Sequence, residues 1–225
     1  HILRYHGAIE KLKEIVSKGS LGKIEYIYSN RLNIGKLRRE ENILWSFAPH
    51  DISVILFLLD DMPVEVNCFG EAYIQKGVYD TTITTLSFKK DIKAHIFVSW
   101  LHPFKEQKLV VVGTKCMAVF NDLDKDKLCL YPHRVKWEGG IPVADKAEKK
   151  AVDIDYREPL KEVCKHFIEC IEKRACPKTD GREGIRVLKV LHDAQISLEK
   201  KKGICRKAVA SEKDYFIHEL SLIHI

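Results

Sequence analysis

Residues 42–59, NILWSFAPHDISVILFLL, form a mostly apolar stretch with one charged side chain, Asp51. The spacing of the apolar positions is close to the period of a buried helix. These positions are Phe47, Ile52, Val54, Ile55, Leu58 and Leu59. Because proline is tolerated in a first helical turn, Pro49 predicts that the helix begins at Ser46 or Phe47. A helix of this composition has to be covered by other elements, so we expect the remaining chain to fold around it.

His50 lies near the predicted start of this helix, in an otherwise apolar run. An imidazole at the mouth of an apolar helix can be shielded from bulk water and still reach a cavity, as a general acid or base must. A core histidine with a satisfied hydrogen bond would give the same pattern. From the residues alone, both interpretations stay open.

The length and charge of the chain limit the classes of protein it can belong to. Its 225 residues are enough for one large or two small domains with a substantial core. The net charge of +6 comes from scattered basic residues, and the densest clusters, at 36–39, 146–150 and 200–202, are short. A nucleic-acid-binding face would be broader and interleaved with aromatic side chains, so nucleic-acid binding is disfavoured. No apolar run is long enough to span a bilayer, and no signal peptide is present.

The seven cysteines are an odd number without CxxC spacing. This pattern favours reduced thiols in a cytoplasmic protein over disulfides, and it predicts no zinc or other metal site. Because residue 1 is histidine, we expect the chain to be a fragment of a longer protein.

The residues before the central stretch predict a helix and then a strand. Apolar residues on one face and a glycine stop predict the helix over residues 7–18. Alternation over residues 23–34 predicts a long strand, one face of which becomes polar and cationic toward its end. The side chains of this end are Arg31, Asn33, Lys36 and Arg38. Such an end often faces a ligand, although an exposed sheet edge would look the same.

The chain after the central stretch is rich in predicted strands, within residues 63–75, 79–88, 92–101, 108–112, 117–120 and 127–131. Two helices are expected to close the domain. The first starts at Pro159 and has an apolar face of Leu160, Val163, Cys164, Phe167, Ile168 and Ile171. The second, capped by Asp180, is expected to bury Ile185, Leu188, Leu191 and Leu198.

The predicted fold class is therefore α+β, with a mostly antiparallel sheet of about six strands and helices packed on one face. Strand residues such as Ile83 and Phe97 are too apolar to leave in water. The uncovered face of the strands within residues 63–120 is thus predicted to carry a homo-oligomer contact.

Four segments occur in an informative order: GSLGKI at 19–24, WSFAPHDIS at 45–53, EPLKEVCKHF at 158–167 and TDGREGIRVLKVL at 179–191. Together they resemble the C-terminal half of the Gfo/Idh/MocA oxidoreductases, the glucose–fructose oxidoreductase and inositol dehydrogenase family. The resemblance implies a two-domain enzyme whose N-terminal Rossmann domain binds NAD or NADP. That domain would be missing from this chain, in agreement with the absence of a GxGxxG motif.

The resemblance also implies roles for individual residues. His50 would be the catalytic acid–base residue, and Ser46 stands where many relatives have an aspartate one turn earlier. Arg4 and the neighbouring His6 would lie near the cofactor. The stretches SNRLNIGKLR at 29–38 and SWLHPFKEQKLVVVG at 99–113 most resemble members that act on nucleotide-linked amino sugars or their uronates. The implied substrate-binding residues are Arg31, Asn33, Lys36, Arg38 and Ser46, with arginine suited to a diphosphate.

Trp100 and His102 end a predicted strand and could border the same pocket, although burial of Trp100 in the core is the simpler explanation. The implied function is the oxidation of a hydroxyl of a sugar or nucleotide-linked amino sugar by hydride transfer to NAD or NADP. The alternative is a non-catalytic sugar-binding or scaffolding module of the same fold, which the serine at position 46 favours.

The predicted domain covers residues 1–208, and residues 209–225 are expected to be a linker or non-native tail. Within the tail, KDYFIHE at residues 213–219 resembles the opening of hexapeptide-repeat acyltransferases. A fused or pathway acyltransferase is therefore a candidate partner, and a frayed C-terminus is the simpler explanation.

Overall fold

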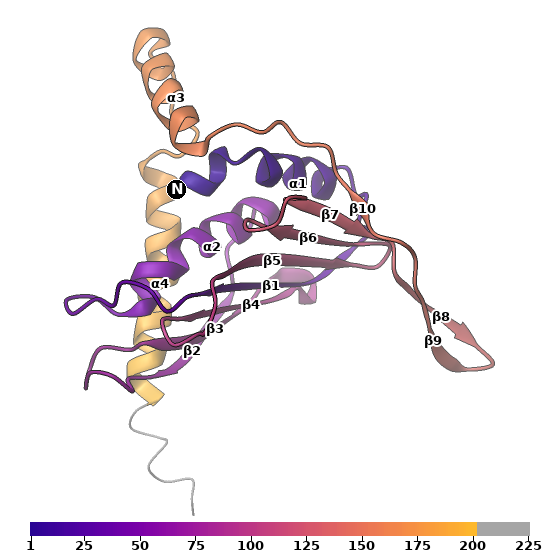
Figure 1. Cartoon of the computed structure of the whole chain (residues 1–225), viewed down its shortest axis with the longest axis horizontal. Coiled ribbons are helices and arrows are strands. Elements are labelled where there is room, and N and C mark those ends of the chain that lie inside the picture. The colour runs from indigo at the N-terminus through magenta and orange to yellow at the C-terminus, as the bar shows by residue number, and fades with distance from the viewer. Residues whose placement is uncertain (202–225) are drawn as a thin grey trace, which may run out of the picture.

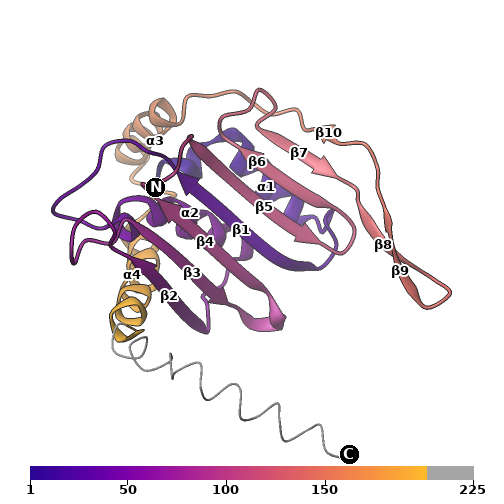
Figure 2. The same ribbon diagram turned by 60° about the horizontal axis from the view of Figure 1, so that its bottom comes forward.

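The computed structural model describes residues 1–201. An eight-stranded sheet runs through the molecule, in the order β10-β7-β6-β5-β1-β4-β3-β2. Neighbouring strands are antiparallel except β1 and β4, which pair in parallel. Helices α1, α2 and α4 lie on one face of the sheet (Figures 1 and 2). The predicted α+β class is confirmed, with eight strands in this sheet where about six were expected.

The strands of the sheet are β1 (Ile24–Leu32), β2 (Glu65–Glu71), β3 (Thr81–Ser87), β4 (Lys93–Ser99), β5 (Glu106–Gly113), β6 (Met117–Asn121), β7 (Leu128–Tyr131) and β10 (Lys150–Ala151). A separate hairpin consists of β8 (Arg134–Glu138) and β9 (Ile141–Asp145). The α-helices are α1 (Gly7–Ser17), α2 (Ile43–Leu59), α3 (Pro159–Lys173) and α4 (Gly181–Lys201), with 3-10 helices at Ile2–Tyr5 and Lys89–Asp91.

Helix α2 is the buried centre of the fold, as its composition predicts. It begins at Ile43, because the side chain of Asn42 accepts a hydrogen bond from the Trp45 amide and caps the helix. The predicted start at Ser46 or Phe47 is therefore wrong, and Pro49 lies in the second turn. Burial of α2 between the sheet and helices α1 and α4 outweighs the hydrogen bond that the proline cannot donate.

Helix α4 packs against α2 and the edge strand β2. Its buried residues are Val187, Val190, Leu191, Ala194 and Leu198. The predicted burial of Leu191 and Leu198 is confirmed, but Ile185 and Leu188 are exposed. They lie on the side of the helix that faces away from the core.

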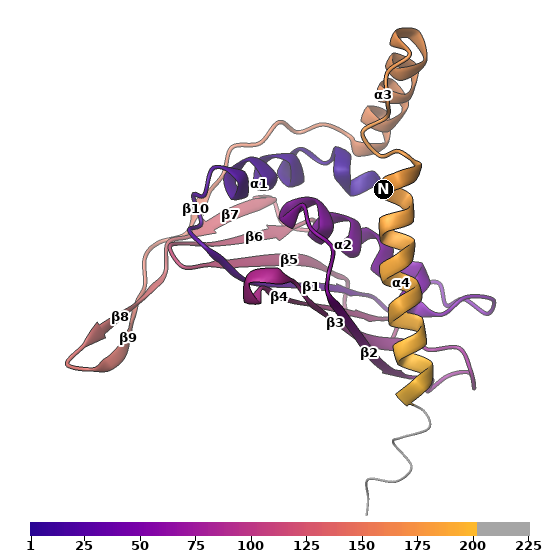
Figure 3. The same cartoon turned by 180° about the vertical axis from the view of Figure 1, so that it is seen from behind.

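Helix α3 does not close the domain, and this expectation is wrong. It stands away from the sheet, above the 3-10 helix Ile2–Tyr5 (Figures 1 and 3). Four of its apolar side chains are more than half exposed, namely Leu160 56%, Phe167 63%, Ile168 55% and Ile171 63%, while Val163 is partly buried. Only Cys170 of α3 is buried. The amphipathic pattern is real, but the sheet does not cover it.

No helix within residues 1–201 is both long and apolar enough to cross a membrane. The predicted boundary at residue 208, the tail at 209–225 and the acyltransferase-like stretch lie outside the described residues.

Candidate active site

His50 lies near the middle of α2 and not near its start as predicted, because the helix begins at Ile43, and its ring is partly buried. Its Nδ1 atom is buried and has no hydrogen-bond partner within residues 1–201. Buried polar atoms are almost always hydrogen-bonded, so an unpartnered imidazole nitrogen is unusual. This observation favours a site histidine over a core histidine with a satisfied hydrogen bond, and the latter stays the alternative.

The residue after His50 anchors this part of the helix to the sheet. Asp51 accepts hydrogen bonds from Arg31 at 2.7 Å (Nε to Oδ2) and 3.2 Å (Nη2 to Oδ1). Ser29 Oγ donates to Asp51 Oδ1 at 2.5 Å. The Arg31 and Asp51 side chains are only 10% and 4% exposed. This forked pair binds β1 to α2 directly beside His50.

The polar chain continues from Arg31 toward the N-terminal helix. With the Gln107 amide oriented to satisfy both of its groups, its oxygen accepts from Arg31 Nη1 at 3.3 Å and its nitrogen donates to Asp122 Oδ2 at 3.0 Å. Asp122 Oδ1 lies 3.4 Å from His6 Nε2, and this contact lowers the pKa of Asp122. His6 in turn accepts from the Ala8 amide and caps α1.

The environment of His50 favours its neutral form. Burial lowers the pKa of His50 below its ordinary value, and the positive charge of Arg31 lowers it further, while Asp51 opposes this shift. An imidazole that is neutral at neutral pH can accept a proton, so its electrostatics suit a general base.

Arg4, predicted near the cofactor, is buried in an ion pair of its own. Its Nη1 donates to Glu183 Oε1 at 2.7 Å, and Ser53 Oγ donates to the same oxygen at 3.3 Å. The guanidinium carbon of Arg4 lies 3.6 Å from the centre of the Phe57 ring. Burial lowers the pKa of Arg4. Arg4 therefore joins the 3-10 helix Ile2–Tyr5 to α2 through Phe57 and to α4 through Glu183.

The predicted substrate-binding residues fall into two groups. Arg31 is buried and its donors go to Asp51 and Gln107, so it is a support for α2. Asn33, Lys36 and Arg38 lie on the loop between β1 and α2, where Lys36 and Arg38 are exposed. Ser46 is partly buried, one turn before His50. The loop thus leads into the start of α2, whereas His50 lies near the middle of this helix.

Trp100 and His102, which follow β4, have different surroundings. Trp100 is 2% exposed and belongs to the core. His102 packs edge-on against Phe104, at 4.4 Å between ring centres, and its Nδ1 lies 2.8 Å from the Phe104 carbonyl.

Residues 9–119 match the model of the GFO/IDH/MocA C-terminal domain, a segment that contains β1, α2 and His50. This segment is a Gfo/Idh/MocA C-terminal domain. No curated protein sequence is significantly similar to the chain.

Solved structures share the fold of this Gfo/Idh/MocA domain. The UDP-N-acetylglucosamine 3-dehydrogenase GnnA from Acidithiobacillus ferrooxidans matches with a TM-score of 0.73 at 23% identity, over 89% of this chain and 61% of that one. A protein assigned as an oxidoreductase from Magnetospirillum magnetotacticum MS-1 matches with a TM-score of 0.71 at 26% identity, over 86% and 61%. Aldose-aldose oxidoreductase from Caulobacter crescentus has a TM-score of 0.70 at 16% identity, over 89% and 61%. The chain thus spans about three-fifths of the length of these relatives.

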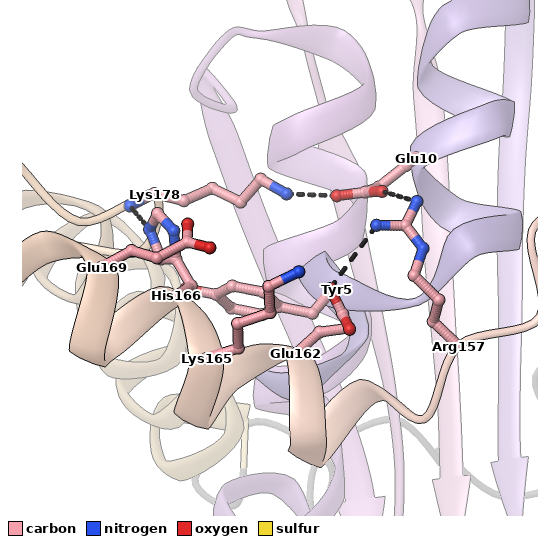
Figure 4. A pocket seen from close by; sticks show the side chains of 8 residues that line it. All are labelled: Tyr5, Glu10, Arg157, Glu162, Lys165, His166, Glu169 and Lys178. Atoms are coloured by element: carbon pink, nitrogen blue, oxygen red, sulfur yellow. Dashed lines mark hydrogen bonds and ion pairs between the residues drawn. The ribbon is translucent and has the colours of Figure 1, made fainter.

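A second polar site lies between α3 and α1 (Figure 4). Glu10 binds both Lys178 and Arg157, and Arg157 lies 3.5 Å from Glu162. Lys165 and Glu169 complete a cleft with as many acidic as basic side chains. None of the predicted site residues lines it, and its ion pairs tie α3 to α1. Within residues 1–201, no group of three potential ligands could hold a metal ion.

The role of Asp51 was not predicted from the sequence. A signal was present, because a single carboxylate in an apolar helix requires a buried cation. Ser29 and Arg31 stand two residues apart on the preceding strand and therefore share a face. By contrast, the sequence gives no indication that Gln107 and Asp122 lie near Arg31. Their position depends on the pairing of β1 with β5, which residue patterns do not reveal.

The pKa of His50 can be measured directly on the chain. In NMR titrations its ring protons, assigned by their loss in His50→Gln, are expected to show a pKa below the ordinary histidine value of about 6.5. Since the folded pKa is lowered, the folded state resists protonation. The contribution of neutral His50 to the free energy of unfolding is therefore fully present above about pH 6.5, the pKa of histidine in the unfolded chain. It is lost as the pH falls through the lower pKa that His50 has in the folded state. The urea midpoint of His50→Gln should accordingly fall less between pH 7.5 and pH 5. A His50 midpoint at or above 6.5 would contradict the described environment.

Proposed function

We propose that this chain is the substrate-side domain of an NAD(P)-dependent dehydrogenase that oxidises a hydroxyl of a sugar or nucleotide-linked sugar. The observation that carries the proposal is His50, a partly buried imidazole with an unpartnered nitrogen and a lowered pKa, held beside a rigid Arg31–Asp51 pair. In this role His50 accepts the proton of the substrate hydroxyl. The nicotinamide, when bound, supplies the acceptor for the hydride.

The substrate class follows from the loop and from one relative. Lys36, Arg38 and Arg39 are exposed on the loop that leads into α2, close in sequence to its cap. Arginine and lysine there would suit the phosphates of a nucleotide sugar, with Asn33 and Ser46 nearer to sugar hydroxyls. The name of the A. ferrooxidans relative, a UDP-N-acetylglucosamine 3-dehydrogenase, supports a nucleotide-linked amino sugar.

The dinucleotide itself requires a second domain. Within residues 1–201 the one parallel strand pair, β1 with β4, lacks a glycine-rich turn that could cradle a pyrophosphate. The residues of this domain therefore fit the acid–base part of the reaction and do not fit the whole cofactor. NAD and NADP are equally compatible with them.

We further propose that this second domain docks on α3. Helix α3 and the start of α4 lie close to the N-terminus of the chain (Figure 1). The exposed apolar side chains of these helices include Phe167, Ile185 and Leu188. An exposed apolar stripe of this kind commonly marks an interaction site. A nucleotide-binding domain seated on α3 would lie next to the 3-10 helix Ile2–Tyr5, which α3 contacts.

A non-catalytic sugar-binding module is the second candidate. The observation that favours it is Ser46, whose hydroxyl stands one turn before His50 and cannot stabilise an imidazolium as a carboxylate does. In such a module the loop would bind the sugar and His50 would be a hydrogen-bonding residue.

Three further assignments belong to the proposal. The six cysteines of residues 1–201 are free thiols, which suits a cytoplasmic protein. The scattered basic residues supply no nucleic-acid footprint. The uncovered sheet face carries apolar and aromatic side chains and suits a homo-oligomer contact.

The experiment combines the chain with a separately produced nucleotide-binding domain of a relative and follows nicotinamide absorbance with a panel of nucleotide sugars. Neither part alone is expected to turn over, and the mixture is expected to oxidise at least one nucleotide sugar. Phe167→Glu should weaken docking at least about tenfold, because it places a charge in the apolar stripe. Tyr73→Glu, at an equally exposed aromatic in the β2–β3 connection, is the matched control and should dock normally. Sugar binding without turnover in any mixture would favour the module instead.

A further inference from the structure

The hairpin β8–β9 forms an arm outside the main sheet. Its turn, Gly139-Gly140, has φ of 59° and 83°, which two glycines adopt without strain and which suits a tight two-residue hairpin turn. All strand residues of the arm are exposed except the partly buried Asp145. A two-stranded hairpin is at best marginally stable in water by itself. An arm of this kind therefore requires a partner surface.

The two faces of the arm differ. Val135 pairs with Ala144 and Trp137 pairs with Pro142, so these four apolar side chains share one face. Val135 is 65% exposed and Trp137 is 71% exposed. On the other face Lys136 forms an ion pair with Asp145 at 2.7 Å. Ile141 and Val143 also lie on this second face and are 65% and 38% exposed, so both faces lack cover and only the first is free of charged side chains.

The direction of the arm shows where the cover would come from. Helices α1 and α2 lie on one side of the sheet, and the arm projects to the other side (Figures 1 and 3). That other side is the uncovered face of the sheet, on which strand alternation places apolar and aromatic side chains. They include Tyr26, Tyr28, Ile83, Phe97, Val110, Val112, Met117 and Val119. Any molecule seated on this face would lie alongside the arm.

The dimensions fit a second copy of the chain. Eight strands about 4.8 Å apart make a face of about 35 Å by 20 Å, close to the ~800 Å² per partner of a stable dimer. Sheets pack face to face about 10 Å apart, whereas strands of five residues reach about 17 Å. The arm is thus long enough to pass the edge of a partner's sheet. A domain tethered at His1 would enter at the opposite end of the molecule (Figures 1 and 3).

We propose that the β8–β9 arm clasps a second copy of this chain, with Val135 and Trp137 packed on the partner beside a sheet-to-sheet contact. This arm contact presupposes the homo-oligomer proposed above, in which the uncovered sheet faces meet. It is a second contact between the same two copies. A twofold axis makes the contact occur twice, because each copy offers both an arm and a sheet face. Trp137 is the side chain with the most apolar area to bury at this contact.

The test measures the dimer dissociation constant of the 225-residue chain by sedimentation. Trp137→Glu is expected to raise this constant at least about tenfold, as for a central aromatic of an interface. Phe97→Glu, in the centre of the sheet face, is expected to abolish the dimer. Phe167→Glu, an exposed aromatic on α3, is the matched control and should leave the constant unchanged. In addition, the fluorescence of Trp137 can be obtained as the difference between the wild type and Trp137→Phe. Acrylamide should quench this fluorescence less as the concentration of the wild-type chain rises and the dimer forms.

The outcomes separate the clasp from the sheet contact. A dimer that Phe97→Glu breaks and Trp137→Glu leaves intact overturns the clasp and keeps the sheet contact. A chain that stays monomeric at high micromolar concentration overturns both, and neither result depends on whether the chain is an oxidoreductase.

Discussion

Replacing Asp51 with asparagine is expected to lower the free energy of unfolding by about 3–5 kcal/mol, because it leaves the buried charge of Arg31 without a counter-ion. Both side chains are almost fully buried, so water cannot take over the lost interaction. Urea unfolding followed by circular dichroism measures the change, and a shift of the midpoint by at least about 1 M is expected. Arg31→Met should cost a similar amount, since it leaves the carboxylate of Asp51 with Ser29 as its remaining donor.

The matched control is an exposed ion pair of similar length. Lys11 Nζ lies 2.8 Å from Glu14 Oε2, with both side chains about two-fifths exposed. Glu14→Gln should leave the urea midpoint within experimental error, because water screens such pairs. In the double variant Arg31→Met with Asp51→Leu, most of the stability should return, since no unpaired charge stays buried. Equal losses for Asp51→Asn and Glu14→Gln would mean that the Arg31–Asp51 pair is solvated in solution.

The second large effect concerns turnover in the chain combined with a nucleotide-binding domain. His50→Gln is expected to lower kcat on the order of a hundredfold or more, because loss of a general base removes a proton acceptor from the transition state. The Michaelis constant should change little, since glutamine keeps a hydrogen-bonding group at this position. Steady-state rates with a nucleotide sugar measure both constants.

His95→Gln is the matched control for His50. Burial lowers the pKa of His95 as well, but His95 lies on the uncovered face of the sheet, bonded to Tyr26 and stacked on Tyr28. Its replacement should leave kcat within a few-fold. If His50→Gln alters the Michaelis constant alone, then His50 binds substrate and the acid–base role is wrong.

Much of the fold follows from periodicity in the sequence. Alternation identified the strands of the sheet from β1 to β7, and the apolar composition of residues 42–59 identified the buried helix α2. These predictions succeed because the period of the apolar residues is a local property of each element. His50 was also recognisable from the sequence, as a titratable side chain in an apolar run. The start of α2 was not, because the Asn42 cap and the burial of the first turn outweigh the preference of proline for that turn.

The sequence did not determine which part of the molecule each side chain or apolar helix face contacts, and only the tertiary structure decided this. Arg31 was predicted to bind substrate, but the pairing of β1 under α2 places Asp51 within 2.7 Å of it. The apolar stripe of α3 looks the same in sequence whether its own sheet or another domain covers it, and the structure leaves it exposed. The arm β8–β9 was not predicted, because exposed strands have no buried face to impose an alternating pattern. A sequence states which surfaces must avoid water, and the path of the chain in space determines what covers them.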